Sequence, residues 1–180
     1  MLYFVLVIAC VVSVCAVVAA LRSLSPVVVL SVPPVADHKS LISSVSALAA
    51  DSVNADENGD GLNFREVEKR LDASYAIIGR RAMAGDKINE YERLIYENYY
   101  KITETLNFAR SNGDFSALPH VGGLPRVYAL CSVIVRYSGG TVLEETLSEC
   151  VKAFNCACPL NYAEITALPH VLGFALCEYI

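Results

Sequence analysis

The spacing of apolar residues along the chain predicts helices almost throughout. Apolar positions recur at steps of three and four residues, which places them on one face of a helix. The predicted helices cover residues 40–53, 64–81, 89–110, 127–137, 142–154 and 162–180. No stretch has the alternation and turn chemistry of a β-hairpin. We therefore predict an all-α fold.

Capping and helix-breaking residues predict where several of these helices begin and end. Thr141 is followed three residues later by Glu144, which predicts a capping box at the start of the 142–154 helix. Pro159 prevents that helix from continuing. Pro125 suits the first position of the 127–137 helix.

The amino-terminal stretch is long enough and apolar enough to cross a membrane. Leu2 to Leu21 carries no charge, and a helix of that length rises about 30 Å, the thickness of the hydrocarbon core. The alternative is a cleaved signal peptide, which needs a positive amino-terminal region, a shorter apolar core and a small-x-small cleavage site. Because those features are missing, we favour a retained transmembrane anchor over residues 1–22. Arg22, on the carboxyl side of the span, favours a cytoplasmic location for the rest of the chain.

Proline residues predict a connector between the anchor and the rest of the chain. Pro26, Pro33 and Pro34 interrupt any helix, so residues 23–39 are predicted to be a connector leading to a helical domain over residues 40–180. The apolar last helix predicts that this domain is incomplete at its carboxyl end.

All 19 acidic residues lie beyond Arg22, and an acidic domain without a basic stripe argues against a nucleic-acid partner. The expected partner is the lipid bilayer.

An acidic loop resembles part of a calcium-binding loop. Asp56, Asn58 and Asp60 occupy positions one, three and five of such a loop, and Gly61 occupies the glycine position. The carboxylate expected at position twelve comes one residue early, as Glu66. The alternative is an ordinary acidic turn before a helix, and we favour that alternative.

Cysteines and histidines offer weaker metal-binding patterns. Cys150, Cys156 and Cys158 cluster without a CxxC pair or a clear fourth ligand, so apolar core roles are favoured over zinc. The segment ALPHV occurs at 117–121 and 167–171, which places His120 and His170 at matching positions. Their flanking sequences differ, so coincidence and a core role for His170 are favoured over an internal repeat.

Residues 114–130, DFSALPHVGGLPRVYAL, carry the strongest family likeness. This segment resembles the amino-terminal region of cyclic β-1,2-glucan synthases, whose PRVYALA pattern follows a helix like the one at 92–106. Further segments are similar to the family in the same order: 140–147, 151–154, 159–169 and 172–180. The chain departs from the family at Ala163, Thr166 and Gly173, where the family has Gly, Trp and Arg.

The resemblance implies a non-catalytic helical module of a membrane glucosyltransferase that uses UDP-glucose. Its catalytic parts would lie beyond residue 180, and no nucleophile elbow, P-loop or zinc-protease motif is present in this chain. No cofactor and no catalytic residue are therefore expected here. The alternative is a stand-alone membrane-anchored helical binding protein with an acidic, calcium-responsive loop.

The matched residues also have a physical interpretation. Arg126 and Tyr128 can pair with acidic or carbonyl groups on a neighbouring helix, and Glu164 is a suitable partner. We treat an Arg126–Glu164 ion pair, beside Pro125 at the helix start, as a structural hypothesis.

Overall fold

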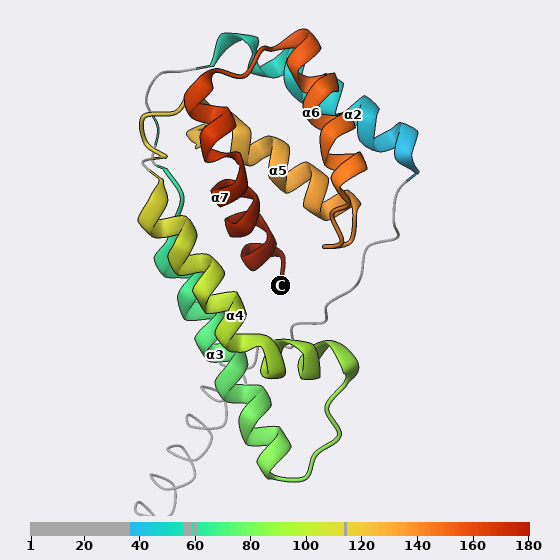
Figure 1. Cartoon of the computed structure of the whole chain (residues 1–180). Coiled ribbons are helices and arrows are strands. Elements are labelled where there is room, and N and C mark those ends of the chain that lie inside the picture. The colour runs from blue at the N-terminus through green and yellow to red at the C-terminus, as the bar shows by residue number, and fades with distance from the viewer. Residues whose placement is uncertain (1–36, 56–58, 60, 114) are drawn as a thin grey trace, which may run out of the picture. The chain divides into compact units, whose positions relative to one another are not determined.

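The computed structural model describes residues 37–55, 59, 61–113 and 115–180. The chain divides into two compact units, Met1–Ser31 and Val32–Ile180, and the described residues all belong to the second. This unit is mainly helical, as predicted: its described residues form six α-helices, one short 3₁₀ helix and one two-stranded sheet (Figure 1).

Helix α5 (Arg126–Tyr137) is the centre of the unit because it buries two faces. One face contributes Val127, Tyr128 and Cys131 to a core shared with α7 (Tyr162–Tyr179). The other contributes Leu130 and Ile134 to a second core. A helix buried on both sides needs apolar residues around most of its circumference, which explains its nearly continuous apolar sequence.

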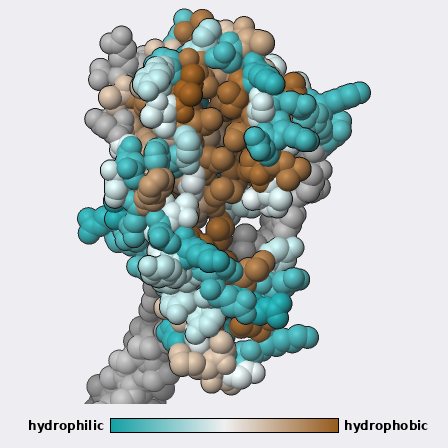
Figure 2. All heavy atoms as spheres, in the orientation of Figure 1, coloured by the Kyte–Doolittle hydropathy of each residue, from teal (hydrophilic) through white to brown (hydrophobic). Residues whose placement is uncertain are grey.

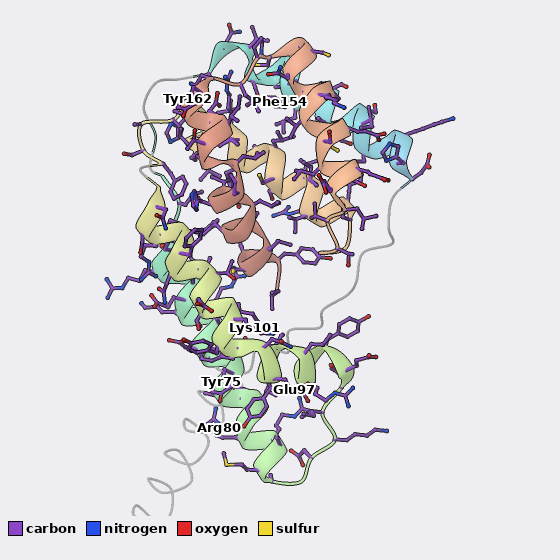
Figure 3. All side chains as sticks on the ribbon, in the orientation of Figure 1. Tyr75, Arg80, Glu97, Lys101, Phe154 and Tyr162 are labelled. Carbon is purple, nitrogen blue, oxygen red and sulfur yellow. The ribbon has the colours of Figure 1, made fainter. Side chains whose placement is uncertain are left out.

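The second core is completed by α2 (His38–Asp51) and α6 (Glu144–Ala157), which pack on each other. The 3₁₀ turn η1 (Ser52–Asn54) follows α2 directly. Leu41, Val45 and Ala49 of α2 recur at steps of four residues and are buried. They meet Phe154 of α6, which is fully buried (Figure 3).

Helices α3 (Phe64–Met83) and α4 (Glu90–Asn112) lie side by side (Figure 1). Tyr75 of α3 stacks on Tyr96 and Tyr99 of α4, with ring centroids 5.0 and 4.1 Å apart (Figure 3). On the face seen in Figure 2, hydrophilic residues cover most of α3 and α4, whereas hydrophobic residues gather over α5, α6 and α7. The α3–α4 pair therefore depends on aromatic contacts as well as on aliphatic burial.

A short hairpin precedes α5, where the sequence predicted only a loop. Strands β1 (His120–Val121) and β2 (Leu124–Pro125) are antiparallel, and Gly122 and Gly123 connect them with φ of 61° and 81°. Two consecutive positive φ angles are those of the tight hairpin turn that glycine accommodates without strain. Pro125 consequently ends β2 and caps α5, so the predicted placement of Pro125 inside the helix is wrong by one residue.

The capping box predicted at Thr141 is also wrong. Helix α6 begins at Glu144, and its N-cap is Leu143, whose side chain cannot cap. Thr141 instead lies in the turn after Gly139 and Gly140, where its backbone N–H donates to the carbonyl of Ser138. Glu144 and Glu145 in the first turn interact favourably with the positive end of the helix dipole, and no side chain caps the helix.

The predicted anchor over 1–22 and most of the connector over 23–39 lie outside the described residues. Among the helices of the described part of the chain, none combines the length and the apolar character needed to cross a bilayer.

Candidate functional site

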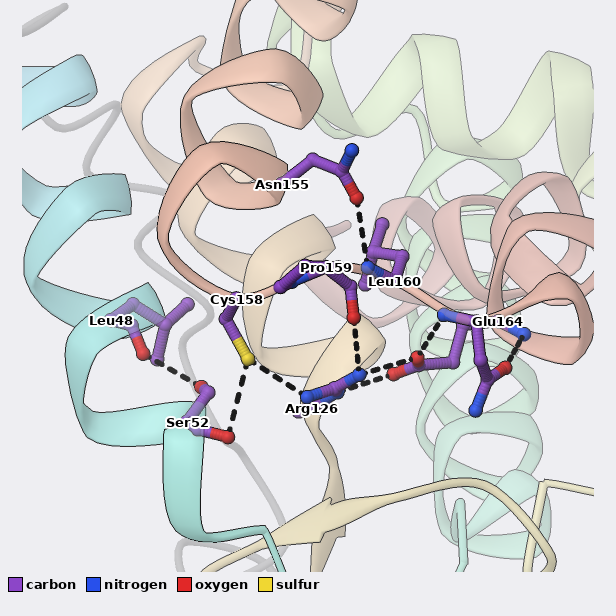
Figure 4. Close-up of polar contacts among 9 residues, drawn as sticks. Leu48, Ser52, Arg126, Asn155, Cys158, Pro159, Leu160 and Glu164 are labelled. Carbon is purple, nitrogen blue, oxygen red and sulfur yellow. Dashed lines mark hydrogen bonds and ion pairs between the residues drawn. The ribbon is translucent and has the colours of Figure 1, made fainter.

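A polar network joins the starts of α5 and α7 in the interior of the unit (Figure 4). Arg126 is the first residue of α5, and Glu164 is the third residue of α7. Only 10% of the Arg126 side chain and none of the Glu164 side chain is exposed. The ion pair put forward as a hypothesis from the sequence is therefore present, and it is buried.

The guanidinium of Arg126 faces four acceptor atoms. Its Nε donates to Oε1 of Glu164 at 2.6 Å, and its Nη2 donates to Oε2 at 2.7 Å. Nη2 also donates to the carbonyl of Pro159 at 2.9 Å, and Nη1 lies 2.8 Å from Sγ of Cys158. This paired geometry is the strong form of the arginine–carboxylate interaction.

Cys158 extends the network to a third part of the fold. Its thiol donates to the carbonyl of Ser52, 3.4 Å away, at the end of α2. Ser52 in turn donates to the carbonyl of Leu48 at 2.6 Å (Figure 4). The network thus ties α2, α5 and the α6–α7 connection together.

Glu164 also caps its own helix. The side chain of Asn161 accepts from the Glu164 N–H, and Oε2 of Glu164 accepts from the Asn161 N–H, both at 2.8 Å. A second capping box joins Asn89 and Glu92 at the start of α4. Sequence reasoning missed both, although an Asn followed three residues later by Glu before an apolar run is the signal that would have found them.

The electrostatics of the site favour a fixed charge pair rather than proton transfer. The hydrogen bonds that Arg126 donates to Glu164 raise the pKa of Arg126 above its ordinary value, although burial acts in the opposite direction. Arg126 therefore stays charged at any physiological pH. Both carboxylate oxygens of Glu164 are hydrogen-bonded to Arg126, so the pair holds the starts of α5 and α7 together.

Tyr128 pairs with a different carboxylate from the one suggested. Its hydroxyl donates to Oε2 of Glu178 near the end of α7, at 2.5 Å. Burial, followed by this hydrogen bond, raises the pKa of Tyr128 to about 12. Tyr128 and Arg126 thus attach α5 to opposite ends of α7.

Of the suggested calcium ligands, Asp56, Asn58 and Asp60 lie outside the described residues. Glu66 is exposed and accepts from Nδ2 of Asn63 at 3.0 Å, while its N–H donates to Asn63 Oδ1. Glu66 thus forms part of the amino-terminal cap of α3. Gly61 has a φ of 57°, the left-handed conformation that the turn glycine of a calcium loop adopts.

The clustered cysteines differ in their surroundings. Cys150 and Cys158 are buried, Cys156 is exposed, and all three are free thiols. Burial raises the pKa of Cys150 to about 11. No group of three metal-ligating side chains converges within the described part of the chain.

The two histidines of the repeated ALPHV segments lie in different environments. His120 is fully buried in β1, packs against Gly59, and has no hydrogen-bond partner for either ring nitrogen among the described residues. The ring of His170 lies 5.0 Å from that of Phe108, and its Nδ1 likewise lacks a partner among the described residues. His170 is half-buried in α7.

Comparison with models of known families, with curated proteins and with solved structures finds no match to this chain.

Proposed function

We propose that this chain is a non-catalytic, membrane-anchored helical module of a glycosyltransferase of the cyclic β-1,2-glucan synthase type. Its role would be to scaffold the transferase portion during glucan synthesis. Residues 1–22 would form the transmembrane anchor, and the helical domain would lie on the cytoplasmic side of the membrane. The lipid bilayer and the transferase portion would be its partners, with no cofactor in this chain.

The Arg126–Glu164 pair is the observation that supports this proposal best. The pair joins two of the segments that carry the family likeness, 114–130 and 159–169, through two hydrogen bonds. Contact between two such segments supports a shared structural element.

The chemistry of the network supports a scaffolding role. The Arg126 guanidinium donates to Glu164 and to the carbonyl of Pro159 and lies against Sγ of Cys158, and the pair is buried. A buried pair of this kind holds α5 and α7 in a fixed arrangement, which suits a scaffold.

The nucleotide sequence downstream of the Ile180 codon tests the proposal directly. We expect the frame to continue, or a broken frame to resume, into the membrane helices of a glucosyltransferase. A stop codon followed by unrelated sequence would overturn the proposal. Retention of the chain in the membrane pellet after alkaline carbonate extraction tests the anchor separately, and recovery in the supernatant would contradict it.

The alternative is a stand-alone anchored binding protein with a calcium-responsive loop, and the left-handed Gly61 favours it. Calorimetric titration of the full chain with Ca²⁺ tests this alternative, with Mg²⁺ as a control and Asp56→Ala as the matched variant. Calcium uptake that Asp56→Ala abolishes would favour the alternative, whereas no uptake at millimolar concentrations would reject it.

A further inference from the structure

A polar pocket lies between α3, α5 and α7, away from the Arg126–Glu164 network. Its volume is about 290 Å³, and its polar lining consists of Arg70, Ser132, Arg136, Glu178 and Tyr179. This volume lies just below the roughly 300–1,000 Å³ of most ligand pockets, so only a small metabolite would fit.

Two arginines from different helices converge on this pocket. Arg70 of α3 donates through Nη2 to the backbone carbonyl of Glu178 at 2.8 Å, which fixes its guanidinium at the pocket wall. The guanidinium of Arg136, on α5, has no hydrogen bond or ion pair with any of the described residues, and the residue is exposed. Its charge is therefore available to a ligand.

One carboxylate, that of Glu178, lines the same pocket as the two arginines. Glu178 accepts from the Tyr128 hydroxyl through Oε2, and its Oε1 has no partner among the described residues. Two guanidinium groups and one carboxylate leave the lining with an excess of one positive charge. The pocket thus presents donors for an anion beside an open acceptor.

Each arginine also interacts with a helix end. Arg136 lies one residue before the end of α5, where a cation interacts favourably with the helix dipole. Arg70 donates to a carbonyl in the last turn of α7, which satisfies a free helix carbonyl. The two helix ends thus place both guanidinium groups at one pocket. Paired guanidinium groups in a concave site are the usual means of binding phosphate and carboxylate oxygens.

We propose that this pocket binds a small phosphorylated or carboxylated metabolite that also carries a hydroxyl group. Arg70 and Arg136 bind the anionic oxygens, and the hydroxyl donates to Oε1 of Glu178. Ser132 and Tyr179 supply further hydroxyl partners at the wall. The lone carboxylate selects against anions that lack a hydrogen-bond donor, because it repels them without compensation.

The test measures binding of glycerol 3-phosphate to the full chain in neutral detergent by isothermal titration calorimetry. Glycerate carries a carboxylate in place of the phosphate, inorganic sulfate is an anion without a hydrogen-bond donor, and glycerol lacks the charge. We expect glycerol 3-phosphate or glycerate to bind and glycerol not to bind. The better of the two ligands identifies the preferred anionic group.

Three variants distinguish a specific binding site from non-specific electrostatic attraction of the anion. Arg136→Gln should weaken binding about tenfold or more, since one charge-assisted contact is lost. Arg80→Gln is the matched control, because Arg80 is an exposed arginine of α3 outside the pocket (Figure 3). It should leave the affinity unchanged. Glu178→Gln should strengthen binding of inorganic sulfate by removing a like charge.

Two results would overturn the proposal. One is the absence of binding by either anion at concentrations up to about 10 mM, where even a weak specific site would be occupied. The other is an equal loss of affinity in Arg136→Gln and Arg80→Gln, which would show that net charge alone attracts the anion.

Discussion

Arg126 and Glu164 lie 38 positions apart in the sequence and form a paired, buried ion pair between the first turns of α5 and α7. The same carboxylate closes the capping box of α7. Glu164 therefore sets both where α7 begins and where it docks on α5. Substitutions at these positions separate the two roles.

Breaking the ion pair should destabilise the helical unit strongly. Arg126→Met leaves the Glu164 charge buried without its partner, and such losses cost about 3–5 kcal/mol. Glu164→Gln keeps a side chain able to cap α7 but removes the charge. The double variant should lose much less than the sum of the two single losses, because no unpaired charge remains. Urea unfolding of the full chain in neutral detergent, followed by circular dichroism, gives the free energy of unfolding of the wild type, the two single variants and the double variant. Additive losses would contradict the coupling of the two residues.

Substitutions of the helix-capping residues should lower the free energy of unfolding, whereas substitution of Thr141 should not. Asn161→Ala and Asn89→Ala each remove a side chain that accepts from a free helix N–H, so each should cost about 1 kcal/mol. Thr141→Ala is the matched control, since α6 begins at Glu144 and is not capped by Thr141. Its effect should stay within about 0.5 kcal/mol, as for other surface substitutions. The same unfolding measurement applies, and a loss at Thr141 equal to that at Asn161 would restore the capping box suggested by the sequence.

The Tyr99 hydroxyl should lose its proton only at an unusually high pH. Its hydrogen bond to Asp72, together with burial, raises the pKa of Tyr99 to about 12. Because the folded state holds this proton more tightly than an unfolded tyrosine, the resulting stability is present below pH 10 and is lost as pH rises toward 12. The difference between the ultraviolet titrations of the wild-type chain and Tyr99→Phe isolates this group.

Asp72→Asn provides the control for that titration. Removing the charged acceptor should lower the pKa of Tyr99 toward its ordinary value. Tyr128 should keep its pKa of about 12, because its main cause is burial and its acceptor is Glu178. A Tyr99 titration that Asp72→Asn leaves unchanged would contradict the role of this hydrogen bond.

Thiol labelling should distinguish Cys156 from its buried neighbours. Cys156 is exposed, whereas burial raises the pKa of Cys131 to about 12 and that of Cys177 to about 11. Alkylation requires an accessible thiolate, so Cys156 should be modified first at about pH 8. Peptide mass spectrometry of the full chain measures the order. Equal labelling of Cys131 and Cys156 before unfolding would contradict the described packing.

The sequence anticipated those parts of the fold that depend on neighbouring residues. Val67, Leu71 and Ile78 recur at helical spacing and are buried in α3, as predicted. The hairpin before α5 was missed because its strands are two residues long, too short to show alternation. The wrong start of α6 arose because Thr141 has the right residue type but lies in a turn set by Gly139 and Gly140.

The sequence identified only some of the residues of the candidate site. Charge complementarity suggested Arg126 and Glu164, but Cys158 and the carbonyls of Pro159 and Ser52 gave no signal. A backbone carbonyl acts as an acceptor in every residue, so its role depends on where the fold places it. The same holds for Arg70, whose partner Glu178 lies 108 positions away.

By itself, the sequence determined that the domain is helical and where most of its helices lie, because periodicity, proline and glycine act over a few neighbouring residues. Only the tertiary structure decided which side chains meet. Hydrogen bonds form only at about 3 Å, and the partners Cys158 and Ser52 are 106 positions apart in the chain. Packing of α5 against both cores brings the distant segments of the site together and leaves a pocket between α3, α5 and α7.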